Sequence, residues 1–319
     1  MAVCYWRRKV FEYHALFGWW HVPNILARIP LGQTFHLVKT NSVGMRSSRE
    51  YPKVRPKGRK RIIFTGDSYT AGDGVSNKHR FTDLLEQRYP HLDALNFGLN
   101  GSGTDQQLLI LENMAVEYEA DAFVFCICVE NIARNLYTCF PNFLWDEQLE
   151  TFLPKPYFEL TQSGLHLCNT PVPRERRTQD TLDGWRYGFP YIPGENDAYA
   201  IYKYKDSKHW QVMKAILQKM IKYAKGSPVF IVPMPMYNHY LGELDPVYLD
   251  RFEELADPGN QIHVVDLLPA MTAEPMHVRQ RFRFPDDPHY TRFAHKIVAN
   301  VLKNELGDKI PGLLEINHP

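Results

Sequence analysis

The stretch RIIFTGDSY, residues 61–69, decides the fold. Its first five residues form a short apolar run bounded by Gly66 and Asp67, a pattern that predicts a buried strand ending in a sharp turn. Ser68 then lies just past the carboxyl end of that strand, where open α/β sheets place their ligand sites. Most loop serines are solvated turn residues, so the interpretation of Ser68 as a nucleophile depends on a partner elsewhere in the chain.

That partner is found near the other end of the sequence. Residues 285–289, PDDPH, place His289 three residues after Asp286 and two residues after Asp287. A serine nucleophile needs a base to take its proton, and the base needs a carboxylate to orient it. The two segments together predict a Ser-His-Asp arrangement, in which Asp286 and Asp287 are equal candidates for the acid.

The remainder of the chain alternates apolar runs with segments of helical periodicity. Further strands are predicted at residues 94–97, 122–129, 228–232 and 263–267, and helices at residues 81–88, 104–119, 206–225 and 291–304. Alternation of this kind is typical of a parallel sheet with helices on both faces. We therefore predict an α/β fold, a three-layer α/β/α sandwich with a central parallel sheet.

Two segments interrupt the alternation and set the expected domain boundaries. Residues 1–58 form an N-terminal extension, residues 59–310 the catalytic domain and residues 311–319 a C-terminal tail. Within the catalytic domain, residues 137–200 are rich in proline, glycine and aromatics and include a predicted hairpin at 155–168. We expect this insertion to form a lid or substrate wall.

The N-terminal extension begins with aromatic and basic residues, YWRR at 5–8, followed by Trp19 and Trp20. We expect an amphipathic helix here, packed on the body of the protein or on a second copy in a homo-oligomer, and the alternative is contact with a membrane surface. We expect neither a signal peptide nor a membrane-spanning segment, because no continuous apolar run is long enough.

Charge and cysteine content exclude several functions. Lys and Arg number 37 against 36 Asp and Glu, giving a net charge of +1 that is spread along the chain. A nucleic-acid-binding face needs concentrated positive charge, so nucleic acid is not an expected partner. The five cysteines lack zinc-ligand spacing, which indicates reduced thiols in a cytoplasmic protein. The 13 histidines include no HExxH motif, and we expect no metal or organic cofactor.

Two further clusters follow the second and third predicted strands. Residues 96–103, NFGLNGSG, contain three glycines that let backbone N–H groups approach a ligand closely. Their order is reversed from the dinucleotide fingerprint, so a dinucleotide is not expected. Asn131 follows the third strand. Its amide and a glycine-loop N–H could together hold a developing oxyanion, and the alternative for Asn131 is a cap at the end of the strand.

In these blocks the chain resembles the SGNH (GDSL-type) hydrolases. Residues 66–68 are similar to the nucleophile block, 96–103 to the glycine block and 286–289 to the carboxylate–histidine block. Residues 40–46, TNSVGMR, also look like a segment that precedes the nucleophile strand in one branch of the family. The resemblance covers residues 40–135 and 205–305 and implies a flavodoxin-like sheet of the SGNH hydrolase type.

The resemblance also implies roles for individual residues. His289 would take the proton of Ser68, and the backbone N–H groups of Ser68 and Gly101 would form the oxyanion hole with the Asn131 amide. The family has a further block, between the glycine and carboxylate–histidine blocks, that supplies the oxyanion Asn, and Asn131 is the best match to it. Here it departs from the usual Gly-x-Asn-Asp, because residues 129–132 are VENI. An ungapped alignment would place Glu130 at the amide position, but only Asn131 can donate a hydrogen bond there.

Three functions are compatible with these residues. The first is hydrolysis of a carboxylic ester, an acyl or acetyl ester of a small molecule or sugar, through an acyl-enzyme. The second is an O-acyltransferase or deacetylase acting on a saccharide or natural-product hydroxyl, because the same acyl-enzyme serves both reactions. The third is a catalytically inactive binding protein with the SGNH fold, which the glutamate at position 130 would favour.

Overall fold

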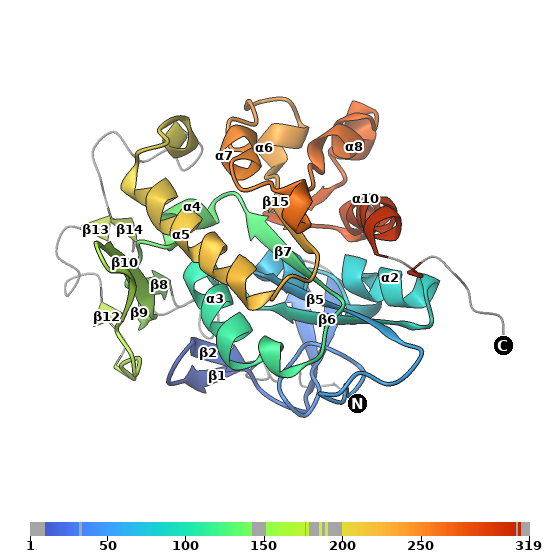
Figure 1. Cartoon of the computed structure of the whole chain (residues 1–319), viewed down its shortest axis with the longest axis horizontal. Helices are drawn as coiled ribbons and strands as arrows, with labels where there is room; N and C mark the ends of the chain where they lie inside the picture. Colours follow the sequence, from blue (N-terminus) through green and yellow to red (C-terminus); the bar gives the residue numbers. More distant parts are fainter. Residues whose placement is uncertain are drawn as a thin grey trace.

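The structure is a computed structural model that describes residues 10–31, 34–141, 151–175, 177–178, 185–186, 189–190, 200–310 and 312–313. At its centre lies a five-stranded parallel sheet in the order β16-β15-β7-β5-β6 (Figure 1). The strands are β5 (Lys60–Gly66), β6 (Leu92–Gly98), β7 (Ala122–Cys128), β15 (Val229–Met234) and β16 (Ile262–Val264). Counted along the chain this is the order 2-1-3-4-5, which is the flavodoxin-like order.

Helices cover both faces of this sheet. Helices α3 (Thr104–Asn113) and α5 (Lys208–Tyr223) pack together on one face, and α2 (Phe81–Arg88) and α10 (Arg292–Lys309) pack together on the other (Figure 1). The α/β/α sandwich predicted from the sequence is therefore confirmed. Helix α3 ends six residues before its predicted end and is followed by the single turn η2 (Ala115–Glu117).

Shorter elements connect the layers. The helices among them are α1 (Ser68–Ala71), α4 (Asn131–Arg134), α6 (Tyr237–Tyr240), α7 (Leu249–Glu253), α8 (Leu268–Thr272) and α9 (Met276–Arg279), with the single turns η1 (Asn77–His79), η5 (Ala200–Lys203) and η6 (Pro258–Asn260). Strands β17 (Arg283–Phe284) and β18 (Asp287–Tyr290) form a short hairpin before α10. None of the helices in the described part of the chain is long and apolar enough to cross a membrane.

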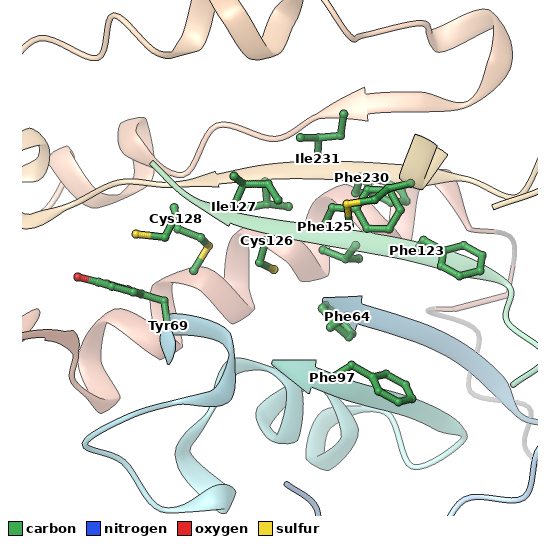
Figure 2. Close-up of a cluster of buried hydrophobic side chains, with 14 of the residues drawn as sticks. Phe64, Tyr69, Phe97, Phe123, Phe125, Cys126, Ile127, Cys128, Phe230 and Ile231 are labelled. Carbon is green, nitrogen blue, oxygen red and sulfur yellow. The ribbon is translucent and has the colours of Figure 1, made fainter. Parts of the chain in front are cut away.

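The core of the molecule is the sheet itself. Every residue of β7, AFVFCIC, is buried, as expected for a central parallel strand covered on both faces. Figure 2 shows aromatic side chains along the middle of the sheet, with Tyr69 and Cys128 near the carboxyl ends of the strands. Full burial of each large apolar side chain contributes about 1.5–3 kcal/mol. The carboxyl ends of the sheet strands are therefore held in place by the packed core beneath them.

The N-terminal extension differs from its prediction. Trp19 and Trp20 lie in strand β2 (Gly18–His21), which pairs with β1 (Phe11–His14), and not in an amphipathic helix. Aromatic residues favour strands, and the positive φ of Gly18, 82°, provides the turn between the two strands. A second hairpin joins β3 (Leu26–Leu31) and β4 (Thr34–Lys39). Residues 5–8 lie outside the described part of the chain.

The described part of the insertion is built from small antiparallel sheets. Strands β8 (Cys139–Pro141), β9 (Thr151–Pro154) and β12 (Arg177–Thr178) form one of them, and β13 (Trp185–Arg186) pairs with β14 (Phe189–Pro190). The predicted hairpin is confirmed as β10 (Tyr157–Thr161) and β11 (Gly164–Cys168). The insertion also contacts the first hairpin, because Tyr13 Oη donates a hydrogen bond of 2.6 Å to the carbonyl of Val172.

Candidate active site

The turn between β5 and α1 presents Ser68. Asp67 precedes it and accepts a 3.0 Å hydrogen bond from the Tyr69 N–H, which caps the short helix. Glycine is required at position 66, since a Cβ there would lie 2.0 Å from the Oγ1 of Thr70. The sequence Gly-Asp-Ser therefore makes a tight turn whose third residue, Ser68, starts α1 at the carboxyl edge of the sheet.

His289 lies between Ser68 and Asp287. Its Nε2 is 2.7 Å from the Oγ of Ser68, and its Nδ1 is 2.7 Å from the Oδ1 of Asp287. The same carboxylate oxygen accepts a 2.8 Å hydrogen bond from the backbone N–H of His289. With the ring proton on Nδ1 facing the carboxylate, Nε2 is free to accept the hydroxyl proton of Ser68.

Asp286, the other candidate acid, lies elsewhere. It is exposed, and within the described residues neither a hydrogen bond nor an ion pair links it to His289. Of the two carboxylates that the sequence left open, the geometry brings only Asp287 to the imidazole.

Two tyrosines hold the strand that carries His289. Tyr69 Oη donates a 3.0 Å hydrogen bond to the carbonyl of Pro288, and the ring centroids of Tyr69 and His289 are 5.1 Å apart. Tyr290 Oη donates a 2.6 Å hydrogen bond to the carbonyl of Pro235. Tyr69 thus holds the histidine segment against the serine turn, and Tyr290 holds it against the loop that follows β15.

The surrounding charges shift the pKa values of this pair. Burial lowers the pKa of His289, but its hydrogen bond to Asp287 and the negative charges of Asp73 and Asp287 outweigh burial, so the pKa is raised above its ordinary value. Burial raises the pKa of Asp287, and its hydrogen bonds to His289 outweigh that effect and hold it below the ordinary value. The arrangement stabilises an imidazolium beside an ionised carboxylate.

A buried ion pair joins the serine turn to α4. The side chain of Asp67 is fully buried and its Oδ2 lies 3.2 Å from the Nη1 of Arg134. Burial raises the pKa of Asp67, and the charge of Arg134 opposes that rise. Arg134 also donates to the carbonyl of Ser102, at 3.4 Å. One side chain therefore connects the serine turn, the glycine loop and α4.

The glycine loop, residues 98–103, lies directly against α1. A Cβ at Gly98 would lie 2.4 Å from the backbone nitrogen of Ala71, so only glycine permits this approach. Asn96 donates a 2.7 Å hydrogen bond to the carbonyl of Thr70 and accepts one of 2.9 Å from the N–H of Gly98. The loop is thereby held beside Ser68.

Three hydrogen-bond donors near Ser68 have no acceptor among the described residues. They are the backbone N–H groups of Ser68 and Gly101 and the side-chain NH₂ group of Asn131. Both the nitrogen and the oxygen of the Asn131 side chain are buried without a partner among the described residues. An unpaired buried polar group costs about 1–3 kcal/mol, and these donors are free to bind an acceptor on a ligand. Glu130 instead has a side chain that is 36% exposed and lies 3.7 Å from Arg134.

Several residues at the site carried no functional assignment in the sequence. Asp73 places its Oδ2 3.9 Å from the Nε2 of His289. Arg46 is fully buried and donates hydrogen bonds of 2.7 Å to the carbonyls of Ala71 and Gly72, just before Asp73. Arg46 belongs to residues 40–46, whose resemblance to a segment of one branch of the SGNH hydrolases was the signal in the sequence. Asp73 had none.

Within the described ranges, no group of three or more His, Cys, Asp or Glu side chains is arranged to hold a metal ion.

No family model matches the chain, and no curated protein matches it. Among solved structures, the chain is similar to a lipolytic protein of the G-D-S-L family from Veillonella parvula, with 14% identity, 77% of this chain and 97% of that chain covered, and a TM-score of 0.44. It is also similar to a lipase/acylhydrolase from Enterococcus faecalis, with 15% identity, 79% and 97% coverage and a TM-score of 0.46.

A third similar structure is an acetylxylan esterase from Geobacillus stearothermophilus. It is 13% identical, the alignment covers 79% of this chain and 97% of that chain, and the TM-score is 0.45. Structural neighbours over more than three quarters of this chain are thus lipolytic proteins and esterases of low sequence identity.

Proposed function

We propose that the protein is a serine hydrolase that cleaves a carboxylic ester of a small molecule or sugar through an acyl-enzyme. The observation that carries this proposal is the position of His289, whose two ring nitrogens lie 2.7 Å from Ser68 Oγ and 2.7 Å from Asp287 Oδ1. Ser68 and His289 are 221 residues apart in the sequence. A contact that spans the whole domain and meets the geometry of an activated nucleophile favours catalysis over a binding role.

In the first half of the reaction, Ser68 Oγ attacks the ester carbonyl while its proton passes to Nε2 of His289. The negative charge on the carbonyl oxygen is held by the N–H groups of Ser68 and Gly101 and by the Asn131 amide. Asp287 stabilises the imidazolium through Nδ1. His289 then returns the proton to the leaving alcohol oxygen, and the acyl group stays on Ser68.

In the second half, His289 takes a proton from water as the water oxygen attacks the acyl carbon. The same donors hold the second oxyanion, and the proton returns to Ser68 Oγ as the carboxylic acid leaves. An acceptor hydroxyl in place of water would give acyl transfer by the same steps, so the identity of the acceptor distinguishes the two activities.

The test is covalent labelling combined with hydrolysis of p-nitrophenyl esters of graded chain length. A fluorophosphonate should modify Ser68, as located by mass spectrometry of the digested protein, and should abolish ester hydrolysis. Ser68→Ala should neither label nor turn over. Ser76→Ala is the control, because the Ser76 hydroxyl accepts a hydrogen bond from the N–H of Leu37 and has no part in the mechanism. Labelling of a different serine would refute the proposal.

A further inference from the structure

Strand β2 of the N-terminal extension contacts the glycine loop through two buried side chains. The indole Nε1 of Trp19 donates a 2.9 Å hydrogen bond to the backbone carbonyl of Asn100. The ring Nε2 of His21 lies 3.1 Å from the side-chain oxygen of the same asparagine. Trp19 is 0% exposed and His21 is 1% exposed. A segment outside the central sheet therefore holds the residue that immediately precedes Gly101.

The hydrogen bonds of Asn100 fix its orientation. Its side-chain nitrogen donates to the Oδ1 of Asp73, so its side-chain oxygen faces His21 and accepts from the Nε2–H of that ring. Burial lowers the pKa of His21 to about 3, which keeps the ring neutral. Three atoms of Asn100 are thus engaged: the carbonyl by Trp19, the amide oxygen by His21 and the amide nitrogen by Asp73.

The contact with Trp19 bears directly on the N–H of Gly101. The carbonyl of Asn100 and the N–H of Gly101 belong to one planar peptide group, so a bond that fixes the carbonyl also fixes the direction of that N–H. Gly101 has a φ of 71°, a conformation that glycine adopts without strain. Phe140 of the insertion packs against Gly101, since a Cβ on Gly101 would lie 2.7 Å from its ring. The rings of Trp19 and Phe140 are 5.8 Å apart.

We propose that Trp19 is a positioning residue for the reaction, which sets the Gly101 N–H at the oxyanion by holding the Asn100 carbonyl. His21 supports the same loop through the Asn100 side chain. This inference rests on the proposed function, because the Gly101 N–H matters only if an oxyanion forms beside Ser68. Under this inference, residues of the N-terminal extension affect turnover by holding the glycine loop in place.

Trp20 offers a matched control on the same strand. Its Nε1 also donates a 2.9 Å hydrogen bond to a backbone carbonyl, but that carbonyl belongs to Val43, within the N-terminal extension. Both indoles are at most 5% exposed. Replacement of either tryptophan by Phe removes one indole hydrogen bond and keeps an aromatic ring. The two variants therefore differ in which backbone carbonyl loses its donor, that of Asn100 or that of Val43.

The experiment measures kcat and KM for p-nitrophenyl acetate, and Tm, in Trp19→Phe and Trp20→Phe. We expect Trp19→Phe to lower kcat by about tenfold or more, short of the roughly 10²–10³-fold lost when a whole oxyanion donor is removed, with little change in KM. Trp20→Phe should lower Tm and keep the wild-type kcat. Equal kcat values in the two variants would overturn the inference.

A second readout separates this inference from the proposed function. Hydrogen exchange of the backbone amides of residues 99–103 should accelerate in Trp19→Phe and stay unchanged in Trp20→Phe. If the wild type hydrolyses no ester, the proposed function fails, while faster exchange in Trp19→Phe still supports the positioning contact. Unchanged exchange overturns it. If Trp19→Phe does not fold, His21→Phe replaces it, because this variant removes the other donor to Asn100. It should lower kcat and accelerate amide exchange in residues 99–103, each by less than Trp19→Phe.

Discussion

Strands β5 and β2 both reach the candidate active site, but they contribute different things. Strand β5 leads into the turn that presents Ser68, a group that would form and break bonds. Strand β2 contributes Trp19 and His21, which contact Asn100 and would take no part in bond making. Under the proposed function, the first region would supply the reacting group, and the second would hold a backbone segment in place.

This difference in role explains why the residues of the first region can be recognised in the sequence and those of the second cannot. A nucleophile, a base and a carboxylate must be particular residue types, so their blocks are recognisable. A side chain that holds a backbone carbonyl needs only a hydrogen-bond donor, and every residue has a backbone carbonyl. Neither partner of such a contact therefore has to be a particular residue type. Variants of the first region should therefore cost several orders of magnitude in turnover, and variants of the second should cost less.

The largest effect is expected at Asp287. Asp287→Asn should lower kcat by about 10⁴-fold, because the neutral amide allows the wrong imidazole tautomer and no longer stabilises the imidazolium. Asp286→Asn is the control, one residue away and exposed, and should keep the wild-type kcat. Steady-state kinetics on one activated ester compares them. A large loss in Asp286→Asn would contradict the geometry described for His289.

The next effect is expected at Asn131. Asn131→Ala should lower kcat by about 10²–10³-fold with little change in KM, the loss of one oxyanion donor. Tm should fall little, since both polar atoms of this side chain lack partners among the described residues. Glu130→Gln is the control and should have a small effect. If Asn131→Ala lowers Tm strongly and leaves kcat intact, Asn131 is a structural cap.

The sheet was predictable because burial on both faces leaves a simple pattern. The run that becomes β7 is apolar throughout, and its predicted and observed starts coincide at Ala122. The first hairpin was not predictable as strands, since a short aromatic segment fits both periodicities and only the turn at Gly18 distinguishes them.

At the candidate site, the contact between Ser68 and His289 could be predicted from residue type and order. The acid could not, because both spacings suit a histidine, and only the structure shows one Asp287 oxygen bonded to the ring and to the backbone N–H of His289. Trp19 could not be identified from the sequence, because it holds only a backbone carbonyl, and Arg46 was indicated only by its place in residues 40–46.

The smallest effect is expected at Asp73, which lies between the two regions. Asn100, which β2 holds, donates a hydrogen bond to the Asp73 carboxylate. The Oδ2 of Asp73 lies 3.9 Å from the Nε2 of His289. The negative charge helps to raise the pKa of His289, so neutral base accumulates only as pH rises through that raised value. Asp73→Asn removes the charge and keeps a hydrogen-bond acceptor.

The pKa of His289 should therefore fall in Asp73→Asn, and the acid limb of the profile of kcat/KM against pH should move to lower pH. Asp286→Asn removes a nearby exposed carboxylate and should leave the limb in place. The plateau at high pH should change little, because the base is already neutral there and Asp73 transfers no proton. A plateau lowered as far as in Asp287→Asn would place Asp73 among the reacting groups and remove the distinction between the two regions. An unmoved acid limb would mean that solvent screens this carboxylate, whose side chain is 30% exposed.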